Sequence, residues 1–322
     1  MILVISGSDD LVAQAIHEEL RQCGQSSELL DFQFFPRRDR LAYTVSSDGQ
    51  VSRSYWLDGA ELNLNNVTSV LWRRPAKVKT ELPNVDPSIA RYVETSSDEV
   101  LEGFFNDLGC FQVPASRTVL KSAYAKIPQL TLAAKLGFNL PVTLITNDPV
   151  EFLDFYRLHN GQVITKTASV QAETWLGPMC TAYARLIHPR DLLHFQDVQS
   201  CAVIAQVYVK KALEVRVTVV GNDVFAAGIH SQVTRRTRVD WRRYDRTSTP
   251  HDIHGLPPEI AQLCLALVRS MGLAYGAIDL ILTPEGQYVF LEINPNGQYK
   301  WIETLTGLPI TKRIVRLLVE HA

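Results

Sequence analysis

The stretch that decides the fold is Gly276-Ala-Ile-Asp-Leu-Ile-Leu-Thr-Pro-Glu-Gly-Gln-Tyr-Val-Phe-Leu-Glu-Ile-Asn-Pro295. Two apolar runs flank the segment Thr283-Pro-Glu-Gly286. Because proline and glycine favour a tight turn at such positions, the stretch is predicted to form a β-hairpin. The hairpin matters for function because polar side chains interrupt both of its apolar runs.

Three of these polar residues are expected on one face of the hairpin. If the hairpin is symmetric about its turn, Asp279 lies opposite Phe290, and Glu292 and Asn294 share the parity of that pair. Side chains alternate between the two faces of a strand, so all three point to the same side. Two carboxylates and an amide oxygen form a hard oxygen set that suits Mg²⁺, and two ions about 4 Å apart would fit such a cluster. The alternative is that the carboxylates are edge-strand charges that face solvent or pair with arginines.

The strand predicted upstream of the hairpin has the same division of faces. From Leu213 to Val220, the residues Glu214, Arg216 and Thr218 alternate with three valines. Alternation places the valines on one face and the polar residues on the other. One face is therefore expected to pack in the core and the other to carry chemistry.

The rest of the chain reads as a mixture of helices and strands. Further strands are predicted over 2–5, 67–72, 141–146, 163–166, 202–209 and 224–230, and helices over 11–22, 87–107, 124–136, 150–158, 258–271 and 310–320. Leu11, Ile16 and Leu20 are expected on the apolar side of the first helix. The pattern predicts an α/β (α+β) fold with three parts, residues 1–115, 116–205 and 206–322.

The opening strand, turn and helix suggest a dinucleotide-binding fold, but the turn Ser6-Gly-Ser-Asp-Asp10 holds a single glycine. A dinucleotide-binding turn needs several glycines for the backbone to approach a pyrophosphate, so this interpretation is rejected.

Composition narrows the function further. The chain has 322 residues, a formal net charge of −2 and 46% hydrophobic residues, which predicts a folded protein of two or three compact units. The small charge argues against nonspecific binding of nucleic acid or of a membrane surface. No signal peptide is expected from the first residues, the sequence has no apolar run of about 20 residues, and the five cysteines form no CxxC pair. A cytoplasmic protein with reduced thiols is expected.

Six arginines crowd one window of this nearly neutral chain: Arg235, Arg236, Arg238, Arg242, Arg243 and Arg246. Guanidinium groups pair bidentately with carboxylates and phosphates, so the window predicts a local anion site. A nucleic-acid patch is the competing interpretation, but few aromatic residues are interleaved with the arginines.

The order of these segments resembles the motifs of the ATP-grasp superfamily. Within it the chain is most similar to the graspetide synthetases, the peptide maturases exemplified by the microviridin ligases. The closer resemblance is carried by Trp72-Arg-Arg-Pro75, Thr143-Leu-Ile-Thr-Asn-Asp-Pro149, Lys211-Ala-Leu-Glu-Val-Arg-Val-Thr-Val-Val-Gly221, Asp240-Trp-Arg242, Tyr275-Gly-Ala-Ile-Asp279, Leu291-Glu-Ile-Asn-Pro-Asn-Gly-Gln298 and Thr306-Gly-Leu-Pro-Ile310. It implies an ATP-grasp fold, with an N-terminal Rossmann-like pre-ATP-grasp domain and two lobes that sandwich ATP.

The resemblance also implies roles for individual residues. Lys126 and Lys166 would clamp the nucleotide phosphates, Glu214 would accept hydrogen bonds from the ribose, and Asp279, Glu292 and Asn294 would hold magnesium. The linker of Gln206, Val207, Tyr208 and Val209 would hold adenine mainly through its backbone, although many relatives have an acidic residue where this chain has Val207. Arg216, Arg242 and Lys211 would be the catalytic residues, and residues 167–177 would form a flap over the phosphates.

The activity implied is that of an ATP- and Mg²⁺-dependent macrocyclase. Its partner would be a ribosomally made precursor peptide with a leader and an acidic core, and a homodimer is expected from the resemblance. An Asp or Glu side chain of the peptide would be phosphorylated and joined to a Ser or Thr hydroxyl or a Lys amine. Two alternatives stay open: a ligase that adds a free amino acid to a protein tail or small acid, and a nucleotide-binding protein without catalysis.

Overall fold

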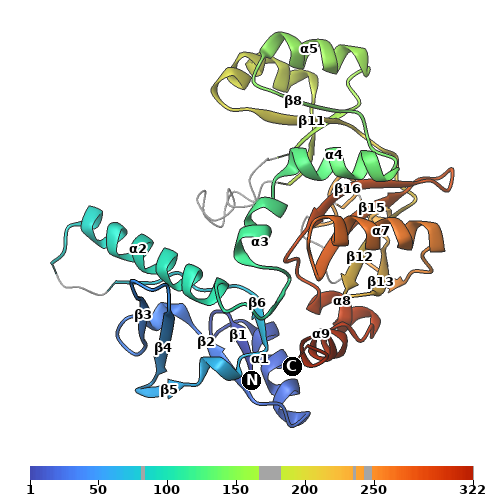
Figure 1. The fold of residues 1–322 in the computed structure, drawn as a ribbon. Coiled ribbons are helices and arrows are strands. Elements are labelled where there is room, and N and C mark those ends of the chain that lie inside the picture. The colour runs from blue at the N-terminus through green and yellow to red at the C-terminus, as the bar shows by residue number, and fades with distance from the viewer. Residues whose placement is uncertain (81–83, 167–182, 235–236, 243–248, 322) are drawn as a thin grey trace.

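The computed structural model describes residues 1–322 except 81–83, 167–182, 235–236, 243–248 and 322. The described residues form four sheets with helices packed around them. Figure 1 shows an N-terminal part, a C-terminal part beside it, and a smaller lobe containing β8, β11 and α5 above them.

The N-terminal part is built on a parallel sheet. Its strands run in the order β2 (Ser27–Leu30), β1 (Ile2–Ile5), β6 (Ser69–Trp72) and β7 (Phe111–Val113). Helix α1 (Leu11–Gln22), capped by Asp10, packs against the face that carries Ile2 and Val4, and α2 (Pro87–Asn106) packs against the face that carries Leu3 and Ile5. Both faces of this sheet are therefore buried, as parallel sheets require.

An antiparallel meander is inserted between β2 and β6. It consists of β3 (Arg40–Val45), β4 (Val51–Leu57) and β5 (Ala60–Leu62). Tyr55 of β4 is fully buried against Phe104 and Phe105 of α2, which ties the meander to the end of that helix.

The C-terminal part contains a five-stranded antiparallel sheet. The strands run in the order β14 (His251–Ile253), β13 (Asp223–Ile229), β12 (Leu213–Val220), β15 (Tyr275–Leu282) and β16 (Tyr288–Asn294). The valines of β12 are buried in a core with α7 (Pro258–Ser270), which confirms the predicted division of faces. Helix α4 (Lys126–Leu136) packs against α7 and β16.

The register of the β15–β16 hairpin differs from the symmetric prediction. Phe290 lies opposite Leu280 rather than Asp279, and Asp279 lies opposite Glu292. The cause is a bulge between Asp279 and Leu280. A bulge sets two residues of one strand against one residue of the other, and here β16 has the extra residue. The bulge places the two carboxylate residues directly opposite each other on neighbouring strands.

The upper lobe has its own small core. Strands β10 (Arg185–Leu186), β9 (Val163–Lys166), β11 (Val203–Val207) and β8 (Thr143–Thr146) form an antiparallel sheet in that order. Helices α5 (Pro149–Leu158) and η3 (Pro189–Ser200) pack together beside it. Phe152, Val163 and Val198 form the centre of this core, which is separate from the other two.

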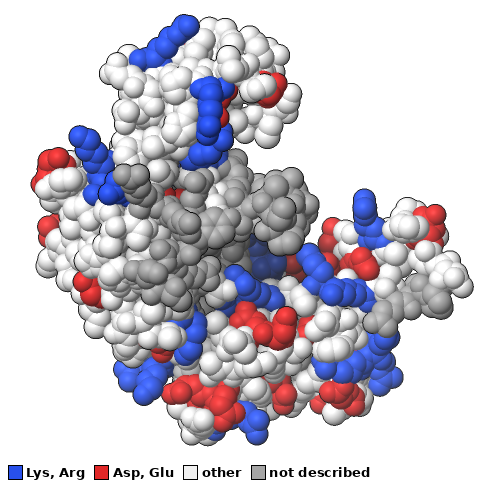
Figure 2. Space-filling model, turned by 180° about the vertical axis from the view of Figure 1, so that it is seen from behind, with Lys and Arg blue, Asp and Glu red and all other residues white. Residues whose placement is uncertain are grey.

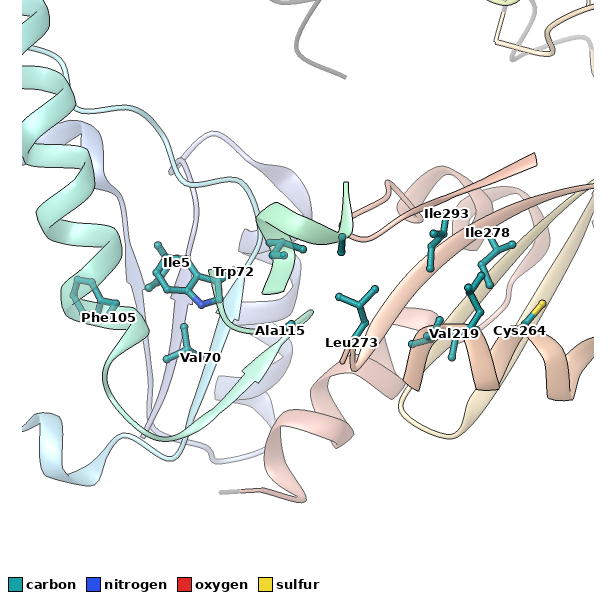
Figure 3. Packing of buried hydrophobic residues seen from close by; sticks show 14 of the residues in the cluster. Ile5, Val70, Trp72, Phe105, Ala115, Val219, Cys264, Leu273, Ile278 and Ile293 are labelled. Carbon is teal, nitrogen blue, oxygen red and sulfur yellow. The ribbon is translucent and has the colours of Figure 1, made fainter. Parts of the chain in front are cut away.

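Two C-terminal helices return the chain to the first sheet. These are α8 (Lys300–Thr306) and α9 (Ile310–Val319). Helix α9 packs beside α1, and the hydroxyl of Ser69 on β6 donates to the carbonyl of Leu318 at 2.9 Å. Figure 3 shows the largest core running from Trp72 and Phe105 towards Val219 and Ile278, with Ala115 and Leu273 between them.

Other differences from the predicted elements are local. Leu11 is 75% exposed, so the first predicted helix buries Val12, Ala13, Ile16 and Leu20 instead. The helix predicted over 124–136 begins at Lys126, after a separate helix α3 (Arg117–Ala123). The remaining short helices are η1 (Phe32–Phe34), η2 (Leu64–Asn66) and η4 (Ser231–Val233). Across the described ranges, no helix has both the length and the apolar character to cross a bilayer.

Candidate active site

A cavity of about 280 Å³ lies where the upper lobe meets the polar face of the C-terminal sheet. Figure 2 shows basic side chains gathered at the hollowed centre of the face seen from behind, next to acidic ones. Among the residues that line the cavity are Lys126, Lys166, Gln206, Val207, Tyr208, Val209, Lys211, Glu214, Arg242, Asp279, Glu292 and Asn294. The structure therefore brings together the residues predicted from sequence, and Arg216 lies directly behind Asp279.

The carboxylates of the hairpin are held by two cations. Arg216 Nη1 donates to both oxygens of Asp279, at 2.8 and 2.9 Å, and Lys126 Nζ donates to Glu292 Oε2 at 2.8 Å. The side chains of Asp279 and Glu292 remain 21% and 27% exposed. Because an ionised carboxylate has about four acceptor positions, each can still accept a ligand from the cavity.

The electrostatics of Glu292 favour its ionised form. Burial opposes ionisation, but the ammonium groups of Lys126 and Lys166 outweigh it and hold the pKa of Glu292 well below its ordinary value. The carboxylate is therefore negatively charged at neutral pH without any bound ion.

Lys166, the last residue of β9, has a different environment. Its ammonium makes no ion pair with a described residue, and burial lowers its pKa, an effect that Glu292 partly opposes. Lys166 lines the cavity, and an anion bound beside it would offset the effect of burial on its charge.

The linker after β11 is fixed by its own backbone and by Gln206. The amide of Gln206 donates to Thr143 Oγ1 at 2.8 Å, so this side chain joins β11 to β8. The backbone amides of Val207 and Tyr208 donate to Val142 O at 2.9 Å and Gln162 O at 2.8 Å. The amide of Val209 donates to no described residue, and so it is the linker amide left for a ligand.

Glu214 and Lys211 form a buried pair at the same end of the cavity. Their side chains are 8% and 5% exposed, and Lys211 Nζ donates to Glu214 Oε1 at 2.9 Å and to Val239 O at 2.8 Å. Burial raises the pKa of Glu214, while Lys211 opposes this rise. Lys211, predicted to be catalytic, here orients the carboxylate of Glu214.

Arg242 is held by an acid that sequence reasoning did not assign to the site. Asp240 accepts from Arg242 Nε at 2.9 Å and Nη2 at 2.6 Å, and also from the amide of Ala184 at 2.9 Å. Burial works against ionisation of Asp240, but the hydrogen bonds from Arg242 prevail and lower its pKa. The fork geometry leaves Arg242 40% exposed toward the cavity.

Some lining residues were missed by sequence reasoning, and some of the predicted site residues lie outside the described ranges. Arg74, Tyr124 and Trp241 also line the cavity. The only sequence signal for Arg74 and Trp241 was their place in the Trp72–Pro75 and Asp240–Arg242 motifs, and Tyr124 had none. The predicted flap over 167–177, and Arg235, Arg236, Arg243 and Arg246 of the arginine window, lie outside the described residues.

The donor set fits a hard divalent cation. Asp279 and Glu292 face each other across neighbouring strands, and Asn294 lies on the same side of β16. Two partly exposed carboxylates and an amide oxygen are the ligands that Mg²⁺ takes in proteins, together with water and phosphate oxygens.

Comparison with known proteins agrees with this architecture. A family model described as a RimK-like ATP-grasp domain matches residues 123–318. The chain is 24% identical over 221 residues to the ribosomal protein bS6–L-glutamate ligase of Escherichia coli O81 (strain ED1a). The aligned region covers 68% of this chain and 70% of that ligase.

Two solved structures are similar over almost the whole chain. One is a RiPP-associated ATP-grasp ligase of Chryseobacterium gregarium in complex with ADP and a leader and core peptide, with a TM-score of 0.88, 26% identity, and coverage of 100% of this chain and 97% of that one. The other is the macrocyclase MdnC of Microcystis aeruginosa MRC bound with precursor peptide MdnA, with a TM-score of 0.85, 25% identity and 99% coverage of both chains. The family model alone spans more than half of the sequence, and the chain therefore belongs to the RimK-like ATP-grasp family.

Proposed function

We propose that this chain is an ATP-dependent ligase that crosslinks side chains within a ribosomally made precursor peptide. The observation that carries the proposal is the cavity itself, in which Lys126, Lys166 and Arg242 face the carboxylates of Asp279 and Glu292. Its support is the similarity, over almost the whole of this chain, to a ligase solved with ADP and a leader and core peptide and to a macrocyclase solved with its precursor peptide.

ATP would lie with its adenine at the linker and its phosphates at the hairpin. The amide of Val209 would donate to the adenine ring, and the carboxyl group of Glu214, oriented by Lys211 at 2.9 Å, would accept hydrogen bonds from the ribose hydroxyls. Lys126, Lys166 and Arg242 would bind phosphate oxygens. Asp279, Glu292 and Asn294 would hold magnesium, for which we propose two ions, and the metal would supply positive charge that offsets the charge of the phosphates.

The reaction would proceed in two steps. An Asp or Glu carboxylate of the peptide attacks the γ-phosphorus of ATP, and ADP leaves, which yields an acyl phosphate. A Ser or Thr hydroxyl or a Lys amine then attacks the acyl carbon, loses its proton and expels phosphate, so each ester or amide forms with net loss of one water. The chain's share is positioning and charge stabilisation, in which Arg216 and Arg242 offset the charge that develops on the phosphoryl group.

The test uses candidate precursors, which are short acidic peptides encoded by open reading frames next to the gene for this chain. Each is incubated with the full chain, ATP and Mg²⁺ and analysed by mass spectrometry. We expect one water mass lost for every crosslink and one ADP released with it. The Asp279→Asn/Glu292→Gln double variant is expected to lose both signals by at least about a hundredfold, since removing charge-stabilising groups costs this much in other enzymes.

Asp252→Asn is the matched control for this double variant. Asp252 is 58% exposed on β14 and pairs with His230 at 2.9 Å, away from the cavity. Undiminished crosslinking by the double variant, beside an unaffected Asp252→Asn control, would rule the assignment out.

A second candidate is favoured by the curated relatives. Because the matched Escherichia coli proteins are named ribosomal protein bS6–L-glutamate ligases, the same nucleotide site could add a free amino acid to a protein tail. In the same experiment, supplied with free glutamate, that activity would appear as the gain of a residue mass. Gain without any loss of water would select the second candidate over the first.

We further propose that the chain acts as a homodimer in the cytoplasm. The support is the resemblance of its motifs to those of the graspetide synthetases, together with the absence of a membrane-crossing helix from the described part of the chain. Light scattering of the purified chain tests the dimer.

A further inference from the structure

The arginine that follows β6 joins the N-terminal sheet to the loop after the β15–β16 hairpin. Arg73 is 3% exposed. It donates from Nη1 to both the backbone and the side-chain oxygen of Asn296, at 3.2 Å each, and from Nη2 to Gln298 Oε1. In return, Asn296 Nδ2 donates to the backbone oxygens of Trp72, at 3.1 Å, and of Arg73. The loop 295–298 is therefore fastened to the end of β6 by hydrogen bonds in both directions.

The same loop contacts the cavity residues on its other side. Arg216 Nη2 donates to Gln298 O at 3.4 Å, while Nη1 of the same guanidinium holds Asp279. Asn294 Oδ1 accepts from the amide of Asn296 at 3.1 Å. One short loop thus contacts Arg73 on one side and two proposed site residues on the other.

Arg73 forms an ion pair with Asp10 through Nε, and its two terminal nitrogens are directed elsewhere. A buried guanidinium is normally compensated by a close carboxylate. The carboxylate of Asp10 is 3.7 Å from Arg73 Nε, and neither that nitrogen nor Asp10 Oδ2 has a hydrogen-bond partner among the described residues. Asp10 Oδ1 instead caps α1 through the amides of Val12 and Ala13. The terminal nitrogens of Arg73 are directed to neutral oxygens of the loop.

We propose that Arg73 is a positioning residue, which fixes the loop 295–298 and through it orients Arg216 and Asn294 at the phosphate end of the cavity. Arg73 does not itself line the cavity, so its effect passes through the loop. The inference deepens the proposed function and rests on it, because it assigns the N-terminal sheet a part in shaping the nucleotide site.

The test is a double-variant cycle on Arg73 and Gln298. Isothermal titration calorimetry measures the affinity for ADP with saturating Mg²⁺ and with EDTA. We expect Arg73→Met and Gln298→Ala each to weaken ADP binding with Mg²⁺ by about tenfold, the lower end for partners that orient metal ligands. The double variant is expected to be no weaker than Arg73→Met alone, since both changes break one connection. Arg73→Lys should recover part of the affinity.

Arg117→Met is the control for stability. Arg117 is another largely buried arginine of the same region, with Glu102 at 2.6 Å and the Trp72 ring at 5.3 Å. Arg117→Met should lower the melting temperature, as Arg73→Met should, but it should not weaken ADP binding with Mg²⁺. A melting-temperature change alone in Arg73→Met, or full additivity of the two variants, overturns the inference.

Gln298→Ala decides the question by itself if Arg73→Met does not fold, because unchanged ADP affinity in that variant overturns the inference. A wild-type chain that binds no ADP overturns the proposed function and this inference together. If instead the wild-type chain binds ADP and the variants bind it equally well, only this inference is overturned.

Discussion

At the scale of single residues, Lys166 is a buried ammonium of the cavity that forms no ion pair with a described residue. Burial lowers its pKa below the ordinary value of 10.5. Between the lowered pKa and 10.5, the folded chain binds fewer protons than the unfolded chain. The contribution of Lys166 to the stability of the fold therefore rises with pH across this window. An anion placed beside Lys166 would raise its pKa again.

We predict that ADP binding is accompanied by proton uptake at alkaline pH. Calorimetric titrations between about pH 8 and 10, in two buffers with different ionisation enthalpies, should reveal uptake of up to about one proton per ADP. In Lys166→Arg the uptake should vanish while ADP still binds, because a guanidinium stays protonated throughout this range. Equal uptake in both proteins would show that another group is responsible.

The residue types of the site were largely readable from the sequence, whereas their partners were not. Alternation along 213–220 placed Glu214 and Arg216 on one face because strand geometry is local. The pairing of Lys126 with Glu292, of Gln206 with Thr143, and of Arg73 with Asn296 depends on contacts between distant segments. The roles assigned to these residues stay proposals until the experiments above are done.

At the scale of elements, the loop after β16 depends on a glycine. A Cβ at Gly297 would lie 2.5 Å from the Cβ of Ala277 and 2.6 Å from Arg216 Nη2, both shorter than any normal contact. The absence of a side chain at this position lets the loop approach the guanidinium closely.

Gly297→Ala is therefore predicted to displace Arg216 or the loop and to slow crosslinking. A shift of about 1 Å can lower a rate up to about a hundredfold. The rate of ADP release with peptide measures the effect. Gly255→Ala is the matched control, because a Cβ there meets nothing within 4 Å and its rate should equal that of the wild type. If both variants keep the wild-type rate, the loop accommodates the methyl group and the close approach has no catalytic importance.

Elements with strong periodicity were predicted well, and those without it were missed. The predicted strands 213–220 and 224–230 and the helix 258–271 agree with β12, β13 and α7 to within a residue. The meander β3–β5 was missed because its strands are mostly exposed and carry little apolar alternation. The bulge in the hairpin was missed because an extra residue in β16 leaves no sign in the composition of the turn.

At the scale of the whole molecule, the cores divide the chain unequally. The N-terminal and C-terminal sheets share two large clusters, whereas the upper lobe has a small core of its own. The domain boundaries predicted at 115 and 205 stay predictions, although α4 packs with the C-terminal sheet.

We predict two calorimetric transitions for the chain without ligands. Phe152→Ala in the lobe core should lower the melting temperature of one transition, since such a change costs about 3–5 kcal/mol, and leave the other unchanged. Leu267→Ala, at a fully buried position beside the C-terminal sheet, should do the reverse. A common shift of a single transition in both variants would show that the lobe unfolds together with the rest.

The packing of α9 against α1 bears on how the chain folds during translation. The apolar stripe of α1, with Ile16 and Leu20, leaves the ribosome long before Ile314 and Leu318, which cover it in the finished protein. The first sheet therefore cannot complete its core before α9 has been synthesised. Until then α9 does not cover the apolar stripe of α1, and transiently exposed apolar surface of this kind favours aggregation and is one reason that chaperones exist.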